Sequence, residues 1–147
     1  MGARISGGIT GIPEDLDFKQ SVRVATTAAG TLATDFENLD VIDGVTLATG
    51  DRIMIKNQVA GADNGIYTVN ATGAPSRAGD ADSSANVTAG MLVPIEEGTT
   101  HADTVWMLST NNVITLGTTA LTFSQYGEAV IIAGAGLTKT GTTLDVV

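Results

Sequence analysis

The chain has 147 residues, the length of one ordinary domain, and 43% of them are hydrophobic while only 4% are aromatic. Its net charge of −9 and its 7 Lys and Arg residues exclude the basic patch that nucleic acid binding requires, and they disfavour an anionic membrane surface. The absence of cysteine excludes disulfides and thiolate metal sites. With 18 glycines and many β-branched residues, the composition predicts an all-β protein.

The N-terminal part of the chain changes character at residue 17. Residues 1–16 contain four glycines, and we expect them to form an extended arm or, equally, a disordered terminus. The first strand is predicted at 19–26, where apolar and polar residues alternate. A short helix fits at 34–39. Apolar residues on both sides of Asp43-Gly44 predict a short hairpin over 39–47.

The clearest strand is predicted at 52–57, with Ile53 and Ile55 on one face and Met54 on the other. An Asn-Gly pair at 64–65 leads into a second apolar run. Asn-Gly between two strands is a strong hairpin signal because both residues tolerate positive φ. The sequence therefore predicts a hairpin with an extended tip.

The second half of the chain is turn-rich at 71–89 and then returns to apolar runs. Further strands are predicted at 91–95, 104–108, 114–116 and 121–126. Pro94 cannot donate a ladder hydrogen bond, so we expect its strand to lie at an edge or to contain a bulge. Strands recur about every eight to twelve residues, which is typical of sandwiches and barrels. We therefore expect an antiparallel β-sandwich or barrel-like module over 17–127.

The last segment, 128–147, combines an apolar strand at 129–133 with a glycine break and a small hairpin at 137–147. An exposed apolar strand needs a partner. We expect this segment to serve oligomerisation or attachment, by pairing with another copy, another protein or the rest of the domain. The residues predicted to make these contacts are Val130, Ile131, Ile132, Leu137, Leu144, Val146 and Val147.

The sequence predicts no catalytic residue and no cofactor site. His101 is the single histidine; Asp103 is close in sequence, but no serine lies in a nucleophile-elbow context, so we expect a surface histidine. The glycines form neither a GxGxxG nor a Walker pattern. Trp106 is predicted to belong to the core, although a lone tryptophan also suits a glycan anchor.

Acidic residues offer two weak alternatives to this picture. Asp80, Asp82 and Ser84 alternate as in some calcium loops, but the later Glu that such a loop needs is missing, so a solvated loop is expected and no metal site is predicted. Glu96 and Glu97 are neighbours, and adjacent strand residues point to opposite faces. They are therefore not expected to form a catalytic pair.

Several short motifs follow one another along 17–123. They are DFKQSVRVAT at 17–26, IDGV at 42–45, GDRIMIKNQ at 50–58, NGIY at 64–67, RAGDAD at 77–82, GM at 90–91, EEGT at 96–99, Trp106 and ITLGTTALTF at 114–123. In this order they resemble a module common in bacteriophage tail proteins. The stretches 133–141 and 144–146 are similar to the glycine-rich repeats of fibre proteins.

The resemblance implies a virion structural protein, assembled in the host bacterial cytoplasm with other virion proteins. Its location is usually a tail fibre or tail tip, and fibre proteins imply a homotrimer. Members of the family are often long, with receptor-binding or enzymatic regions after the module, so contact of this chain with a host receptor is left open. The resemblance carries over no catalytic residue.

Two alternative functions remain open. The first is a head decoration or head-fibre anchor protein, whose arm at 1–16 would insert into a partner surface. The second is a host-glycan-binding module, which would need exposed aromatic platforms. Trp106, Tyr67 and Tyr126 are its candidates.

Overall fold

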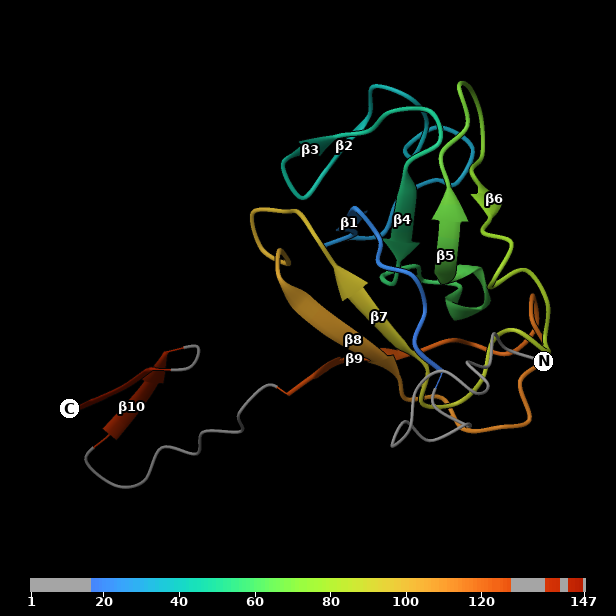
Figure 1. The fold of residues 1–147 in the computed structure, drawn as a ribbon. Coiled ribbons are helices and arrows are strands. Elements are labelled where there is room, and N and C mark those ends of the chain that lie inside the picture. Colours follow the sequence, from blue (N-terminus) through green and yellow to red (C-terminus); the bar gives the residue numbers. More distant parts are fainter. Residues whose placement is uncertain (1–16, 128–136, 141–142, 147) are drawn as a thin grey trace, which may run out of the picture.

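The computed structural model describes residues 17–127, 137–140 and 143–146 (Figure 1). These residues form short strands, one 3-10 helix and no α-helix, so the prediction of a mostly-β fold is confirmed. The strands are β1 (Val24–Ala25), β2 (Val41–Ile42), β3 (Val45–Thr46), β4 (Arg52–Ile55), β5 (Gly65–Thr68), β6 (Ser76–Arg77), β7 (Leu92–Ile95), β8 (Thr104–Leu108), β9 (Phe123–Tyr126), β10 (Leu137–Thr140) and β11 (Thr143–Val146).

A four-stranded sheet in the order β1-β4-β5-β6 contains the predicted central hairpin. β4 and β5 are antiparallel, and Met54 pairs with Ile66. The 3-10 helix Gly61–Asp63 lies in the extended tip between them. Asn64 has a φ of −67°, so it does not adopt the positive φ expected of a turn residue. The hairpin is confirmed, but Asn64 contributes to it through its side chain and not through a turn conformation with positive φ.

Both faces of this sheet are covered. Ile53 and Ile55 belong to one buried cluster and Met54 to another, as the alternation predicts. The first cluster, on the side of the β2–β3 hairpin, is Val24, Phe36, Ile42, Leu47, Ile53, Ile55, Tyr67 and Val69. The second, larger cluster joins Met54 and Ile66 to residues of β7, β8 and β9. The sheet is therefore a middle layer.

The second sheet has the order β7-β8-β9 and is antiparallel. Three of the strands predicted in this region are confirmed. β7 is the first strand in this order, and residues 17–22 run parallel to it on its outer side. The backbone N–H of Val22 donates to the carbonyl of Pro94 (2.9 Å). The expected edge position of Pro94 is confirmed only for the order of the named strands, because the segment 17–22 hydrogen-bonds to the outer side of β7.

Residues 17–26 connect the two sheets, and they do so by parallel pairing. Isolated bridges join Phe18 to Leu92 and Val22 to Ile95. Beyond these bridges, β1 pairs in parallel with β4. The predicted strand is thus divided between two sheets, and a single short strand, β1, is all that remains of it as a regular element.

Several finer expectations are wrong. The four-stranded sheet is mixed rather than purely antiparallel, because β1 is parallel to β4, and the sheets do not close into a barrel. The helix expected at 34–39 is replaced by turns, in which the N–H groups of Thr34 and Asp35 both donate to the carbonyl of Thr31. The strand expected at 114–116 is absent because Thr115 closes a local turn, accepting from the N–H of Thr119 (2.8 Å).

Two hairpins stand outside the larger sheets. β2 and β3 confirm the hairpin predicted around Asp43-Gly44; both turn residues have positive φ, 46° and 79°, as a tight two-residue turn requires. β10 and β11 confirm the backbone of the predicted C-terminal hairpin, with Leu137 opposite Val146. The arm at 1–16, the strand at 129–133 and the contact residues Val130, Ile131, Ile132 and Val147 lie outside the described residues.

Candidate functional site

The tip of the β2–β3 hairpin holds the loop between β7 and β8. The backbone carbonyl of Asp43 accepts from the N–H of Thr99 (2.8 Å). Its carboxylate accepts from the N–H groups of Thr100 and His101, both at 2.9 Å. Burial acts to raise the pKa of Asp43, but the two backbone donors outweigh it, and the pKa is lowered. We call this arrangement the Asp43 clamp.

A cation–aromatic stack lies beside the clamp. The Nζ atom of Lys56, which follows β4, lies 4.1 Å from the centre of the Trp106 ring on β8. The ring of His101 meets Trp106 edge-on, with centroids 5.1 Å apart. Trp106 Nε1 donates to the hydroxyl of Thr104 (3.0 Å). Trp106 is half-buried and packs against the larger cluster, so the core prediction is confirmed only in part.

The electrostatics of the stack favour a neutral imidazole. Desolvation lowers the pKa of His101, nearby Lys56 lowers it further, and Asp43 acts in the opposite direction. Desolvation also lowers the pKa of Lys56. His101 is half-buried rather than a free surface residue, which corrects the prediction. Over residues 17–127 no hydroxyl group is hydrogen-bonded to its ring, so the geometry shows no base–nucleophile pair.

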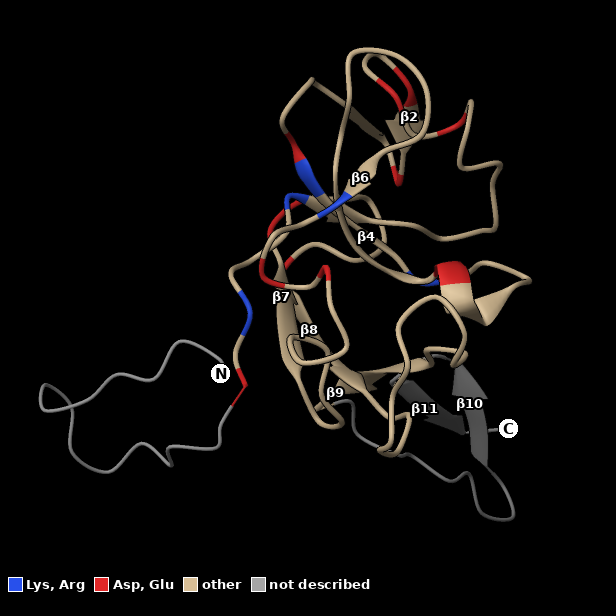
Figure 2. Ribbon diagram, turned by 90° about the vertical axis from the view of Figure 1, so that its right-hand side faces the viewer, with Lys and Arg blue, Asp and Glu red and all other residues tan. Residues whose placement is uncertain are grey.

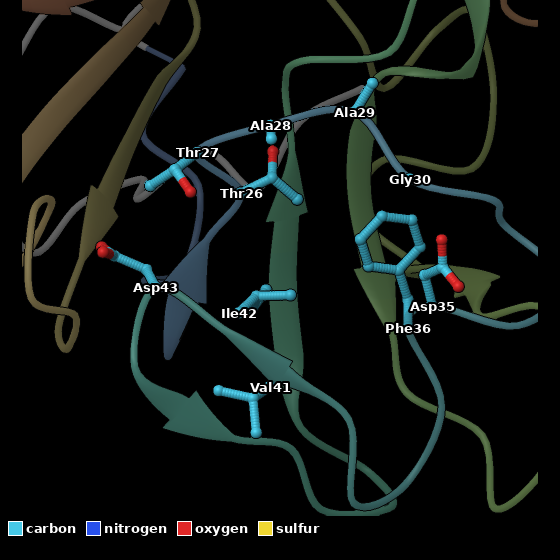
Figure 3. Close-up of a pocket in the computed structure, with 10 residues that line it drawn as sticks. All are labelled: Thr26, Thr27, Ala28, Ala29, Gly30, Asp35, Phe36, Val41, Ile42 and Asp43. Atoms are coloured by element: carbon cyan, nitrogen blue, oxygen red, sulfur yellow. The ribbon is translucent and has the colours of Figure 1, made fainter.

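A hollow of about 190 Å³ opens beside the clamp (Figure 3). The lining residues are Thr26, Thr27, Ala28, Ala29, Gly30, Asp35, Phe36, Val41, Ile42 and Asp43. The carboxylate of Asp35 accepts from the N–H of Thr31 (2.7 Å) and the hydroxyl of Thr34 (2.9 Å), and these bonds lower its pKa. Both carboxylates of the lining are thus already occupied by protein donors. The small residues at 26–30 contain no sequence pattern that predicts this hollow.

Asp80, Asp82 and Ser84, which alternate as in some calcium loops, contact other groups of the protein. Asp80 forms a bidentate ion pair with Arg52, at 2.7 and 2.8 Å. Asp82 accepts from Asn86 (3.3 Å), and the Ser84 hydroxyl accepts from a backbone N–H (3.0 Å). The side chain of Asp80 stays 40% exposed in this ion pair, and Asp82 and Ser84 are exposed, in keeping with the expected solvated loop. Among the residues placed by the structure, no three His, Asp or Glu side chains gather as a metal would require.

The neighbouring glutamates serve different partners. Glu96 accepts a hydrogen bond from the hydroxyl of Ser21, and Glu97 accepts from Arg23 Nε at 3.2 Å. Arg23 also binds Asp51 at 2.5 Å. Both acidic side chains thus tie the end of β7 to the N-terminal segment, and this arrangement resembles a structural contact rather than a pair of catalytic carboxylates.

The three candidate glycan-binding aromatics do not form one platform. Tyr67 is buried, and its hydroxyl donates to the carbonyl of Asp63 (2.6 Å). Tyr126 pairs with Val105, the neighbour of Trp106 on β8, so Tyr126 and Trp106 point to opposite faces of the sheet. Tyr126 is 58% exposed and stands apart from the other two.

Comparison with known proteins gives no further identification. No protein-family model, no curated protein and no solved structure significantly matches the chain. Within the described ranges, no helix has the length and apolarity that crossing a bilayer demands. The resemblance to bacteriophage tail modules therefore rests on the sequence motifs alone.

Proposed function

We propose that the chain is a structural component of a bacteriophage virion, a tail fibre or tail-tip module that acts by assembling with other virion proteins. The support is the ordered set of motifs, together with the way in which their residues contact one another. Arg52 of one motif binds Asp80 of another, 28 positions away. Motifs that are distant in sequence thus maintain one fold, which is what a structural module needs.

A more deeply buried contact of this kind involves Asn64. Its Nδ2 donates to the carbonyl of Leu121 (2.9 Å), 57 positions away, and its Oδ1 accepts from the N–H of Gln58 (2.9 Å). Three motifs meet at this buried side chain. Contacts of this kind hold distant parts of the fold together, and they support the role of a scaffold.

In this proposal the two larger sheets, packed on a shared apolar cluster, form a small sandwich-like module. In the described part of the chain no buried side-chain polar atom lacks a hydrogen-bond partner, which suits a rigid scaffold. The segment 128–147 supplies contacts between subunits of a homotrimer, through the residues named from the sequence.

The test is to locate the protein in particles of the phage that encodes it. Mass spectrometry of purified virions is expected to detect the chain, and immunogold labelling is expected to mark the tail. Labelling on the capsid would instead support the head decoration or head-fibre anchor. Absence of the chain from purified particles would overturn the proposal.

A further inference from the structure

We infer that the contact between His101 and Trp106 is an acid-sensitive latch, which opens when the imidazole of His101 takes up a proton. We call this contact the His101 latch. It holds the side chain of the β7–β8 loop against β8 at neutral pH and releases it in mild acid. This conformational response is independent of the virion role proposed above.

The indole ring of Trp106 has neighbours from two different parts of the fold. The ring of His101 meets it at 78°, with centroids 5.1 Å apart, and Lys56 Nζ lies 4.1 Å from its centre. Because both groups lie within about 5 Å of the same ring, the imidazole and the ammonium are within about 10 Å of each other. A protonated imidazole would therefore share the indole with a second cation.

The charged groups around the imidazole oppose its protonation on balance. Lys56 repels a proton on His101, and Asp43, at the tip of the β2–β3 hairpin, attracts one. β8 contributes no charge, and Figure 2 shows it without Lys, Arg, Asp or Glu. Asp103, in the same loop as His101, is exposed to solvent. Desolvation and Lys56 outweigh Asp43, so the pKa of His101 lies below its ordinary 6.5.

The carboxylate of Asp43 already binds the backbone of the loop. It accepts from the N–H groups of Thr100 and His101, both at 2.9 Å. These bonds lower the pKa of Asp43, so this carboxylate stays ionised while the imidazole titrates. Over residues 17–127 no carboxylate forms an ion pair with the ring of His101. A proton on the imidazole is therefore left without a direct counter-charge.

The backbone of His101 is held on both sides, but its ring is not. The N–H donates to Asp43, and the carbonyl accepts from the hydroxyl of Thr104 (2.7 Å). The imidazole nitrogens make no hydrogen bond within residues 17–127, where no buried side-chain polar atom lacks a partner, so solvent reaches these nitrogens. Protonation can therefore release the ring while the Asp43 clamp keeps the backbone of the loop in place.

The difference in pKa between the closed and open latch sets the direction of the response. A neutral imidazole gains from its edge-on contact with the indole, which favours the closed form above pH 6.5. The open form takes up a proton near the ordinary pKa and the closed form less readily, so acid shifts the population towards the open form. Each pH unit between the two pKa values corresponds to a tenfold shift.

The test follows the imidazole protons of the full chain by NMR. The chain has one histidine and one tryptophan, so these signals belong to His101 and only Trp106 can displace them as a tryptophan ring current. Between about pH 8 and about pH 5, where histidine titrates, the displacement is expected to disappear with a midpoint below 6.5. Signals that keep their displacement at the acid end, or that titrate above 6.5, would overturn the inference.

Three variants test the cause of the response. Lys56→Met removes the ammonium and keeps an apolar stem, so at low ionic strength it should raise the midpoint by at least about 0.3 in pH. Asp43→Asn removes the attracting charge and should lower the midpoint. Asp103→Asn is the matched control, because it removes an exposed charge from the same loop and should leave the midpoint unchanged. An unchanged midpoint in Lys56→Met, or an equal shift in the control, would contradict the latch.

The fluorescence of Trp106 separates release of the ring from unfolding of the domain. Trp106 is half-buried, and departure of the imidazole exposes more of it to water. Its emission should therefore move to longer wavelength over the same pH range, while the circular dichroism stays constant. A His101→Gln variant should lack this shift. Loss of the circular dichroism signal together with the shift would show global unfolding in place of a latch.

Discussion

Replacement of Asn64 by Ala should destabilise the fold strongly. Asn64 is 4% exposed, and its side chain satisfies the N–H of Gln58 and the carbonyl of Leu121. The substitution removes two hydrogen bonds and leaves a buried donor and a buried acceptor unpaired. Each such loss costs about 1–2 kcal/mol, so the free energy of unfolding should fall by about 2–4 kcal/mol.

That loss is large compared with the stability of a domain of this size, which is on the order of 5–15 kcal/mol. It should lower the melting temperature by roughly 5–15 °C, taking about 2–4 °C per kcal/mol. Urea unfolding followed by circular dichroism measures the free energy directly. The slope against urea should stay constant, because the surface exposed on unfolding is unchanged.

The matched control is Asn86→Ala, since the side chain of Asn86 makes only long hydrogen bonds, at 3.3 and 3.5 Å, near the surface. It should change the stability by less than about 0.5 kcal/mol. Equal effects of the two substitutions would refute the argument that Asn64 unites three motifs by buried hydrogen bonding.

Three further predictions concern other contacts. A double-mutant cycle with Arg52→Ala and Asp80→Ala should give a coupling of about 1 kcal/mol in urea unfolding, and additivity within about 0.3 kcal/mol would contradict the bidentate pair. Because the pKa of His101 is lowered in the fold from its ordinary 6.5, the unfolded chain binds more protons just below pH 6.5. The free energy of unfolding should therefore fall as the pH drops below 6.5. Thermal melts of a His101→Gln variant should lack this decline. An identical decline in the variant would exclude His101 as its source. Gly98→Ala should lower the free energy of unfolding by about 1–3 kcal/mol, because φ is +137° and the new Cβ would clash with the carboxylate of Asp43. Gly117→Ala is the control, because it also has a positive φ but has open space around it. Equal shifts of the melting temperature in the two variants would contradict the predicted clash.

The sequence predicted best where local signals determine the structure. The strand β4, predicted from alternation, and its hairpin with β5 are both confirmed, although Asn64 does not adopt the positive φ on which the Asn-Gly signal depends. The division of residues 17–26 between two sheets was not predictable, because parallel pairing with distant strands leaves no local trace. The apolar residues at 114–116 resemble a strand, but Ile114 is buried from an irregular segment just before the turn that Thr115 and Thr119 close.

In the candidate site, too, the local features were predictable and the tertiary contacts were not. Asp43 was recognised as a turn residue, and its φ of 46° agrees. Its use as a clamp depends on a loop about 57 positions away, and the contact between Lys56 and Trp106 depends on how β4 and β8 approach each other. Such contacts arise from tertiary packing, so no periodicity or motif reports them.

The strands β4 and β8 share a sequence pattern but differ in how completely the chain covers them. Both strands are nearly continuous apolar runs, Arg-Ile-Met-Ile and Thr-Val-Trp-Met-Leu, a pattern typical of strands covered on both faces. In β4 the chain itself covers both faces, and Ile53, Met54 and Ile55 are all buried. In β8 one face joins the core, while Val105 and Met107 on the other stay half-exposed. The pattern that β4 satisfies within the chain is thus left incomplete in β8 over the described residues.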